Sequence, residues 1–487
     1  MSVDTNNAAF QDALNLIQYT RQSVFLTGKA GTGKSTFLRY VCENTKKKHV
    51  VLAPTGIAAI NAGGSTMHSF FKLPFYPLLP DDPNLSLQRG RIHEFFKYTK
   101  PHRKLLEQIE LVIIDEISMV RADIIDAIDR ILRVYSHNLR EPFGGKQLLL
   151  VGDVFQLEPV VKNDEREILN RFYPTPYFFS ARVFGQIDLV SIELQKVYRQ
   201  TDPVFVGVLD HIRNNTAGAA DLQLLNTRYG SQIEESEADM YITLATRRDT
   251  VDSINEKKLA ELPGDPITFE GVIEGDFPES SLPTSQELVL KPGAQIIFIK
   301  NDFDRRWVNG TIGVIAGIDE EEETIYVITD DGKECDVKRE SWRNIRYRYN
   351  EKTKEIEEEV LGSFTQYPIR LAWAITVHKS QGLTFSRVVI DFTGGVFAGG
   401  QAYVALSRCT SLDGIQLKKP INRADVFVRP EIVNFAGRFN DRQAIDKALK
   451  QAQADVQYAA ASRAFDKGDM EECLEQFFRA IHIYNCS

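Results

Sequence analysis

Residues 28–35 constrain the fold of this chain more than any other stretch. They read Gly-Lys-Ala-Gly-Thr-Gly-Lys-Ser and match the pattern G-x-x-x-x-G-K-S/T in full. Residues 24–26 are apolar and predict a buried strand before the loop, and residues 36–41 predict a helix after it. In that setting backbone N–H groups converge on phosphate oxygens, Lys34 reaches the outer phosphates and the Ser35 hydroxyl ligates Mg²⁺. The stretch therefore predicts an α/β nucleotide-binding core, and a glycine-rich turn without a ligand is the weaker alternative.

A second apolar run, residues 111–114, ends in the acids Asp115 and Glu116. The carboxyl ends of parallel strands form the edge of the sheet at which nucleotides bind. At that edge Asp115 would hold Mg²⁺, and Glu116 would orient and deprotonate the attacking water. Alternatively, the two acids only cap a helix that begins near Ser118. The phosphate loop upstream favours the catalytic interpretation.

Composition sets broad limits on what this chain is. A length of 487 residues predicts about two to four domains. No apolar run reaches the roughly 18 residues of a membrane span, and the first residues show no secretory signal. The five cysteines are scattered and never spaced as C-x-x-C, which predicts a reducing cytoplasm without a disulfide framework. The net charge of −9 neither supports nor excludes nucleic-acid binding, because local groups of Lys and Arg decide phosphate affinity.

The first part of the chain alternates apolar runs with helical or loop stretches. This alternation predicts a doubly wound parallel sheet in a first domain at residues 1–188. Four prolines between residues 72 and 84 predict an irregular excursion from it at about 70–100. The predicted strands are at residues 24–26, 50–53, 111–114 and 148–151.

The second part of the chain predicts three further units. Apolar runs at residues 241–244 and 388–391 predict a second α/β domain, which we place at 189–287 and 361–436. Short β-rich runs joined by turns predict a small antiparallel barrel inserted at residues 288–360. Residues 437–487 form a helical tail that resembles one tetratricopeptide helix pair, and an ordinary helical hairpin packed on the body fits equally well.

Three further side chains suit a site that transfers phosphoryl groups. Gln156 follows the fourth predicted strand, and its amide can both donate to and accept from a γ-phosphate. Arg199 and Arg408 belong to the second half, and an arginine reaching across a cleft stabilises charge during the transfer. Each arginine alone is more often a surface ion pair. Together and in this order they predict two lobes that close on one nucleotide.

The order of these motifs resembles the Pif-type (petite integration frequency) family of superfamily 1B DNA helicases over about residues 11–428. Residues 115–136 resemble the signature sequence of that family, and residues 307–311 resemble the start of its inserted barrel, which is of the Src-homology-three type. Glu158 departs from the family, which more often has proline there. Further matching segments are residues 53–59, 65–70, 376–382 and 401–408.

The resemblance implies two RecA-like domains that bind ATP and Mg²⁺ between them and single-stranded DNA across their top. The implied catalytic residues are Lys34, Glu116, Gln156, Arg199 and Arg408. The implied nucleotide-binding residues are Gln11, Gly28, Gly31, Thr32, Gly33, Lys34, Ser35, Thr36 and Gly382, with Ser35 and Asp115 on the metal. The implied DNA contacts are Pro54, Thr55, Thr66, His68, His378, Lys379 and Ser380.

The implied activity is ATP-dependent translocation from 5′ to 3′ on DNA with unwinding of duplexes, in repair, recombination or replication. The implied partners are single-stranded, tailed or forked DNA, with G-quadruplex DNA as a further candidate. A monomer or DNA-induced dimer in a bacterial cytoplasm, near the nucleoid and without a membrane, is expected. Two other functions stay open: a DNA-stimulated ATPase switch that does not unwind, and an adaptor whose tail recruits a protein. Phe303 and Trp307 either stack on bases or are buried in the barrel.

Overall fold

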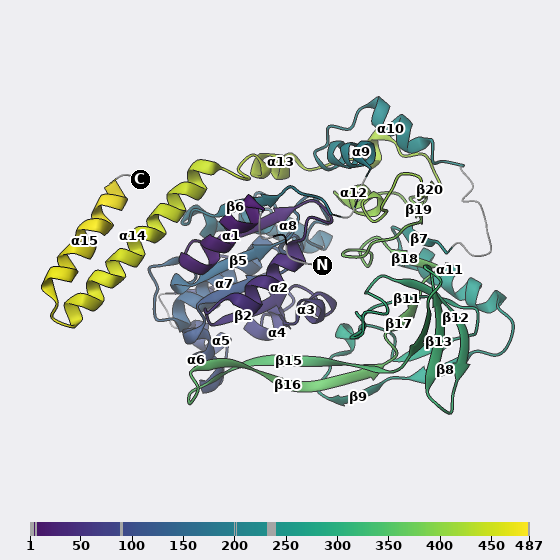
Figure 1. Ribbon diagram of the computed structural model, residues 1–487, viewed down its shortest axis with the longest axis horizontal. Helices are drawn as coiled ribbons and strands as arrows, with labels where there is room; N and C mark the ends of the chain where they lie inside the picture. The colour runs from purple at the N-terminus through teal and green to yellow at the C-terminus, as the bar shows by residue number, and fades with distance from the viewer. Residues whose placement is uncertain are drawn as a thin grey trace.

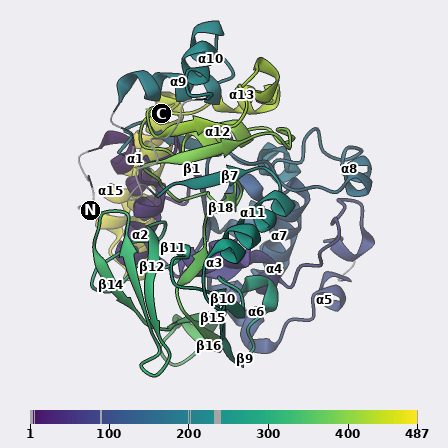
Figure 2. The ribbon, with the colours of Figure 1, turned by 90° about the vertical axis from the view of Figure 1, so that its right-hand side faces the viewer.

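The computed structural model describes residues 4, 7–87, 91–198, 200, 202–230 and 240–485. Two α/β units lie next to each other, an antiparallel β region lies below them in Figure 1, and two long helices extend from the opposite end. Figure 2 shows from the side that the strands of the antiparallel region gather at one end of the molecule. Within the described residues, no helix is both long and apolar enough to cross a membrane.

The first unit is built on a parallel sheet of six strands in the order β3-β2-β4-β5-β1-β6. Helices α1 (Ala8–Tyr19) and α2 (Lys34–Asn44) cover one face, and α7 (Ala122–Tyr135) covers the other. Because successive side chains of a strand point to opposite faces, Val24 and Leu26 pack with α1 and α2 whereas Phe25 packs with α7. The strands are β1 (Val24–Gly28), β2 (His49–Ala53), β3 (Ser65–Thr66), β4 (Leu111–Ile114), β5 (Gln147–Val151) and β6 (Val190–Leu194).

The predicted end of the first domain at residue 188 is wrong, because the last strand of this sheet lies beyond it. β6 lies beyond residue 188, yet it pairs with β1 along its whole length. The first unit therefore extends past the expected boundary. The apolar pattern of β6 is interrupted by Ser191 and Glu193, so the run did not stand out as a buried strand. The proline-rich excursion contains a single turn of 3₁₀-helix (Pro83–Leu85), followed by α5 (Arg91–Phe95) and α6 (Lys100–Gln108).

The second unit has a parallel sheet of four strands in the order β18-β7-β19-β20. Its two central strands are the runs expected near residues 241–244 and 388–391. Helices α9 (Pro203–Arg213) and α12 (Gln401–Leu406) share its apolar core. The other elements are β7 (Ile242–Ala245), β18 (Ala374–Thr376), β19 (Val388–Asp391), β20 (Ile415–Leu417), α10 (Ala219–Asn226) and α11 (Arg248–Glu261).

The inserted β region is antiparallel, as expected, but longer than residues 288–360. A five-stranded sheet has the order β14-β13-β12-β11-β17, and β8 pairs with β10. β8 and β9 precede the expected start and β17 follows the expected end, because these strands are short and partly exposed and lack a long apolar run. The strands are β8 (Ile267–Glu270), β9 (Val272–Gly275), β10 (Glu287–Leu290), β11 (Gln295–Phe298), β12 (Ile312–Asp319), β13 (Thr324–Thr329), β14 (Glu334–Val337) and β17 (Ile369–Leu371).

The two aromatic residues singled out in this region have opposite environments. Trp307 is buried and stacks on Phe298 with ring centroids 4.4 Å apart, so burial rather than base stacking accounts for it. Phe303 is 96% exposed.

A long hairpin of β15 (Glu340–Asn350) and β16 (Glu355–Gln366) reaches from the antiparallel region to the first unit (Figure 1). Its turn lies at residues 351–354, between the two strands. The Val51 N–H donates to the Tyr347 hydroxyl at 3.3 Å, and Tyr347 joins the apolar core of the first unit. The hairpin therefore connects the inserted region to the first sheet.

The C-terminal segment is helical, as expected, with a turn at residues 467–469 between its last two helices. α13 (Pro430–Ala436) leads to α14 (Arg442–Asp466) and α15 (Met470–Asn485). Ile445 and Ala448 pack into the core beside α1, whereas the rest of the helix pair extends away from the body (Figure 1). The first turns of α14 therefore pack on the body.

Candidate active site

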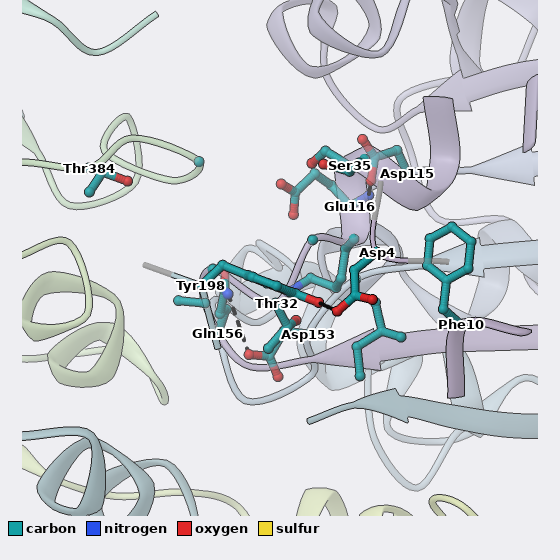
Figure 3. Close-up of a pocket in the computed structure, with 18 of the residues that line it drawn as sticks. Asp4, Phe10, Thr32, Ser35, Asp115, Glu116, Asp153, Gln156, Tyr198 and Thr384 are labelled. Carbon is teal, nitrogen blue, oxygen red and sulfur yellow. Dashed lines mark hydrogen bonds between the residues drawn. The ribbon is translucent and has the colours of Figure 1, made fainter. Parts of the chain in front are cut away.

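A cavity of about 540 Å³ lies between the two α/β units. The phosphate loop and the ends of β4 and β5 line it from the first unit, and the segment after β18 and the end of α12 line it from the second. Figure 3 shows Ser35, Asp115 and Glu116 together on one side of this cavity. Of the expected catalytic and nucleotide-binding residues, these line the cavity: Gly31, Thr32, Gly33, Lys34, Ser35, Thr36, Asp115, Glu116, Gln156, Gly382 and Arg408.

The phosphate loop has the backbone that its glycines predict. Gly31 and Gly33 have φ values of 79° and 90°, a region that favours glycine, and Gly33 is the N-cap of α2. A Cβ on Gly28 would lie 2.7 Å from the Leu194 carbonyl oxygen, so this position accepts no side chain. Gly28 itself is not among the residues that line the cavity. Lys34 Nζ donates to the Gly28 carbonyl at 2.6 Å, which holds the ammonium group over the loop.

The acid pair lies at the end of β4, as expected. Glu116 has a φ of 51°, an uncommon value for a residue with a side chain and one that marks local strain. It occupies the N-cap position of the 3₁₀-turn Ile117–Met119 without a capping hydrogen bond from its side chain, which argues against the capping alternative. Burial, with the neighbouring Asp115, raises the pKa of Glu116 to about 7, against the opposing effect of Lys34 and Arg408. A carboxylate whose pKa lies near neutrality is suited to accept a proton.

Arg408 reaches the cavity from the second unit. Its side chain is almost fully buried, with Nε donating to the Val404 carbonyl at 3.0 Å and Nη2 to the Ser407 hydroxyl at 3.0 Å. These contacts fix the direction of the guanidinium group. Arg199, the other expected arginine, lies outside the described residues.

Part of the cavity lining was not identified from the sequence. Asp4, Asn7, Phe10 and Tyr198 line it, whereas Gln11 does not. The Tyr198 hydroxyl donates to Asp4 Oδ2 at 2.9 Å, and the Tyr198 N–H donates to the Gly31 carbonyl at 2.9 Å. Tyr198 could have been found from the sequence, because it directly precedes Arg199, which was expected to contact the nucleotide.

Direct contacts join the phosphate loop to the second unit. The Ala30 N–H donates to the hydroxyl of Tyr403 on α12 at 3.1 Å, and Lys29 forms an ion pair with Asp210 on α9. Gln156 lies in the same interface, where Gln381 Nε2 donates to its Oε1 at 3.4 Å. A movement of the second unit therefore acts directly on the loop that would hold the phosphates.

A buried ion-pair network crosses the same interface. Arg213 on α9 contacts Asp153 at 3.1 Å and Glu193 at 2.8 Å, and its guanidinium lies over the ring of Phe155. Burying this charge without partners would cost several kcal/mol, so the network sets the relative position of the two units. Sequence reasoning missed Arg213 because it lies on an otherwise ordinary amphipathic helix.

The expected DNA contacts fall in two places. Thr55 and Thr66 are the N-caps of α3 (Gly56–Ala62) and α4 (Met67–Phe71), and their hydroxyl oxygens accept from Ala58 and Ser69 N–H groups. Each hydroxyl keeps its own proton to donate to a phosphate. Pro54 precedes Thr55 and is half-buried, and His68 lies on α4.

In the second unit, His378 and Lys379 follow β18, and burial lowers the pKa of both. The prediction that Ser380 contacts DNA is wrong. Ser380 is fully buried, and its hydroxyl donates to the Val377 carbonyl at 2.7 Å, so its side chain stabilises the turn after β18 and does not reach a DNA surface.

Comparisons with known proteins show which family this chain is similar to. The family model described as PIF1-like helicase matches residues 4–211. ATP-dependent DNA helicase Pif1 of Campylobacter jejuni is 33% identical over 412 residues, which cover 81% of this chain and 88% of that protein. The protein of the same name from Bdellovibrio bacteriovorus is 31% identical, with 88% and 90% covered.

Solved structures are similar as well. Pif1 of a Bacteroides species in complex with ADP-AlF4 is 42% identical, has a TM-score of 0.81 and covers 88% of this chain and 96% of that one. The Bacteroides protein bound to single-stranded DNA is 41% identical with a TM-score of 0.64, and covers 91% and 99%. The match confirms an α/β fold with a RecA-like parallel-sheet core. With the identities and shared lengths above, it shows that the chain belongs to the PIF1-like helicase family.

Proposed function

We propose that this chain is an ATP-dependent DNA helicase that translocates from 5′ to 3′ on a single strand and unwinds duplexes. The observation that supports this most is the cavity between the two α/β units. The phosphate loop and the acid pair enter it from the first unit and Arg408 from the second. A nucleotide bound there would contact both units, so its hydrolysis would change how they fit together.

Within this proposal each side chain has a defined task in hydrolysis. Lys34 leaves the loop carbonyls and binds the outer phosphates, and Glu116 takes the proton of the attacking water. Gln156 senses the γ-phosphate, and Arg408 stabilises the charge that develops on it.

Ser35 and Asp115 fit a Mg²⁺ site, because both line the cavity and offer the hard oxygen ligands that this ion prefers. Bound there with phosphate oxygens, Mg²⁺ would neutralise charge on the transferred group. Among the described residues, no group of three or more His, Cys, Asp or Glu side chains is placed to hold a metal ion. A site of one carboxylate, one hydroxyl and the phosphates themselves is consistent with that result.

The proposal also assigns roles to the inserted antiparallel region and to the helical tail. The antiparallel region with β15 and β16 would be the inserted Src-homology-three type barrel, and the helical tail a separate interaction element. One similar structure concerns unwinding at forked DNA by two coordinating Pif1 helicases, at 41% identity and a TM-score of 0.61. This favours forked DNA as a substrate and a DNA-induced dimer. An enzyme with this activity would act on chromosomal DNA, and in a bacterium that DNA is in the nucleoid.

The proposal is tested by ATP turnover with and without oligo-dT, followed by unwinding of matched duplexes with a 5′ or a 3′ tail. Turnover is expected to rise with oligo-dT, and only the 5′-tailed duplex is expected to unwind. Stimulation without unwinding of either duplex would favour the ATPase switch. Unwinding of the 3′-tailed duplex alone would reverse the direction.

Changing His378 and Lys379 to alanine together is expected to weaken binding to all oligonucleotide sequences alike. Both groups suit phosphates, which carry no sequence information. Because burial lowers the pKa of His378, the charge lost is mainly that of Lys379, and for a single strand this should make the slope of log affinity against log salt shallower by about 0.7. Labelled oligo-dT and a mixed-sequence oligonucleotide are titrated between 50 and 200 mM salt, the range in which counterion release has a large effect.

The matched control removes Lys447 and Lys450 on α14, which takes away lysine charge in the C-terminal helix pair. It should leave the salt slope as it is in the parent. A flat salt response of the parent itself, or a strong preference for one base sequence, would contradict phosphate-based binding.

A further inference from the structure

Residues 74–77 form a short surface segment with the sequence Pro-Phe-Tyr-Pro, which we call the aromatic tab. The residues on either side of it, Leu73 and Leu78, are buried in the core of the first unit. Between these two anchors Phe75 is 84% exposed and Tyr76 53% exposed. The chain thus leaves the core for four residues and presents two large aromatic side chains to solvent.

The backbone of the tab is fixed at both ends. α4 ends at Phe71, and its C-cap residue Lys72 has a φ of 50° that turns the chain sharply. The Leu73 N–H donates back to the His68 carbonyl at 2.9 Å. At the other end the Leu78 N–H donates to the buried carboxylate of Asp123 at 3.0 Å. Pro74 and Pro77 each fix their own φ angle. Little conformational entropy would therefore be lost when something binds to this segment.

The turn lays Phe75 over His68. The two rings are parallel to within 9°, with centroids 5.1 Å apart. Burial, with Arg121 nearby, lowers the pKa of His68 below its ordinary value, which favours the uncharged form of the stacked imidazole. One face of Phe75 is therefore supported by His68.

The stacked pair lies beside the hydroxyl groups expected to contact phosphates. Thr66 caps the helix that carries His68, and Ala53 pairs with Thr66 between β2 and β3. Thr55 follows Ala53 by two residues at the same carboxyl edge of the sheet. Phosphate-binding hydroxyl groups and an exposed aromatic face therefore occur together, which is the combination that single strands require.

We propose that Phe75, supported by His68, is a stacking platform for one nucleobase of the bound single strand. This rests on the proposed function and adds a residue to its DNA site. A flat ring supported from behind suits a nucleobase, because every base has a π-face and the contact needs no sequence preference. A docking protein would instead require an extended apolar surface, and the tab offers one ring and the half-exposed Tyr76.

The test compares three substitutions of Phe75 in the full chain. Phe75→Ala is expected to weaken binding of oligo-dT about tenfold, the scale of one lost base stack. Phe75→Leu keeps apolar bulk but loses the π-face, so it should resemble the alanine variant, whereas Phe75→Trp should bind as well as the parent. The matched control is Phe478→Ala, which removes a 64% exposed phenylalanine of α15, in the helix pair that extends from the body (Figure 1).

A fluorescent base analogue gives a second readout. Oligo-dT with one 2-aminopurine should be quenched on binding to the parent and to Phe75→Trp, and less so on binding to Phe75→Ala. Parental affinity and quenching in Phe75→Ala would overturn the platform, and tight binding by Phe75→Leu would point to an apolar partner surface instead.

The design separates this inference from the proposed function. If oligo-dT stimulates ATP turnover by the parent and by Phe75→Ala at the same DNA concentrations, only the platform fails. If the parent neither binds oligo-dT nor responds to it, both fail. Because Phe75 contributes little to the core, the thermal unfolding midpoint of each variant should match that of the parent, which shows that the loss is local.

Discussion

Replacing Arg408 with alanine is expected to lower ATP turnover by about 10³-fold or more, with a much smaller change in ATP affinity. The guanidinium enters the cavity from the second unit, and it is needed most when charge shifts onto the γ-phosphate. Turnover is measured at saturating ATP and oligo-dT, and affinity is measured separately with a fluorescent nucleotide.

Arg408 is also a buried hydrogen-bonding residue, so the design needs a control for structural damage. Ser407→Ala removes the hydroxyl that accepts from Arg408 Nη2 and leaves the guanidinium in place. It should cost far less turnover than Arg408→Ala. Arg408→Lys keeps the charge but loses the forked geometry, and is expected to remain well below the parent. Equal losses of affinity and turnover in Arg408→Ala would instead indicate that this arginine clamps the ground-state phosphates.

The parts of this molecule that the sequence predicted are those whose signals are local. The phosphate loop lies within eight residues, and the acid pair directly follows an apolar strand, so both were located without knowledge of the fold. The two parallel sheets followed from buried apolar runs in the same way. Strands with polar or exposed positions, such as β6 and β9, were missed because they lack such a run.

Contacts between residues far apart in the chain could not be predicted from the sequence motifs. Glu158 stood out only as a departure from the family, yet its carboxylate accepts from the Tyr177 hydroxyl at 3.1 Å and from Arg429 Nε at 2.7 Å. Arg213 and Tyr403 likewise have partners in the other unit. Such pairs depend on the packing of whole domains. The same holds for Ser380, whose motif position suggested DNA but whose environment is a buried turn.

Replacing Glu116 with glutamine is expected to slow ATP hydrolysis by about 10²- to 10⁴-fold while nucleotide and DNA binding persist. The amide keeps the size of the carboxylate and one acceptor oxygen, but its NH2 group only donates, so it cannot take the proton of the attacking water. Asp115→Asn should behave differently, because it weakens the proposed Mg²⁺ site and should therefore lower affinity for the magnesium complex of ATP as well.

The decisive comparison is between hydrolysis and binding in the same preparations. Glu107→Gln makes the same chemical change on α6 of the same unit, where the side chain pairs with Lys104 at the surface, and it should hydrolyse ATP at the parental rate. Single-turnover hydrolysis with and without oligo-dT measures the chemical step directly. A parental rate in Glu116→Gln would show that another group activates the water. A loss of nucleotide binding equal to the loss of hydrolysis would show that the strained backbone at Glu116, rather than its carboxylate, is what the site requires.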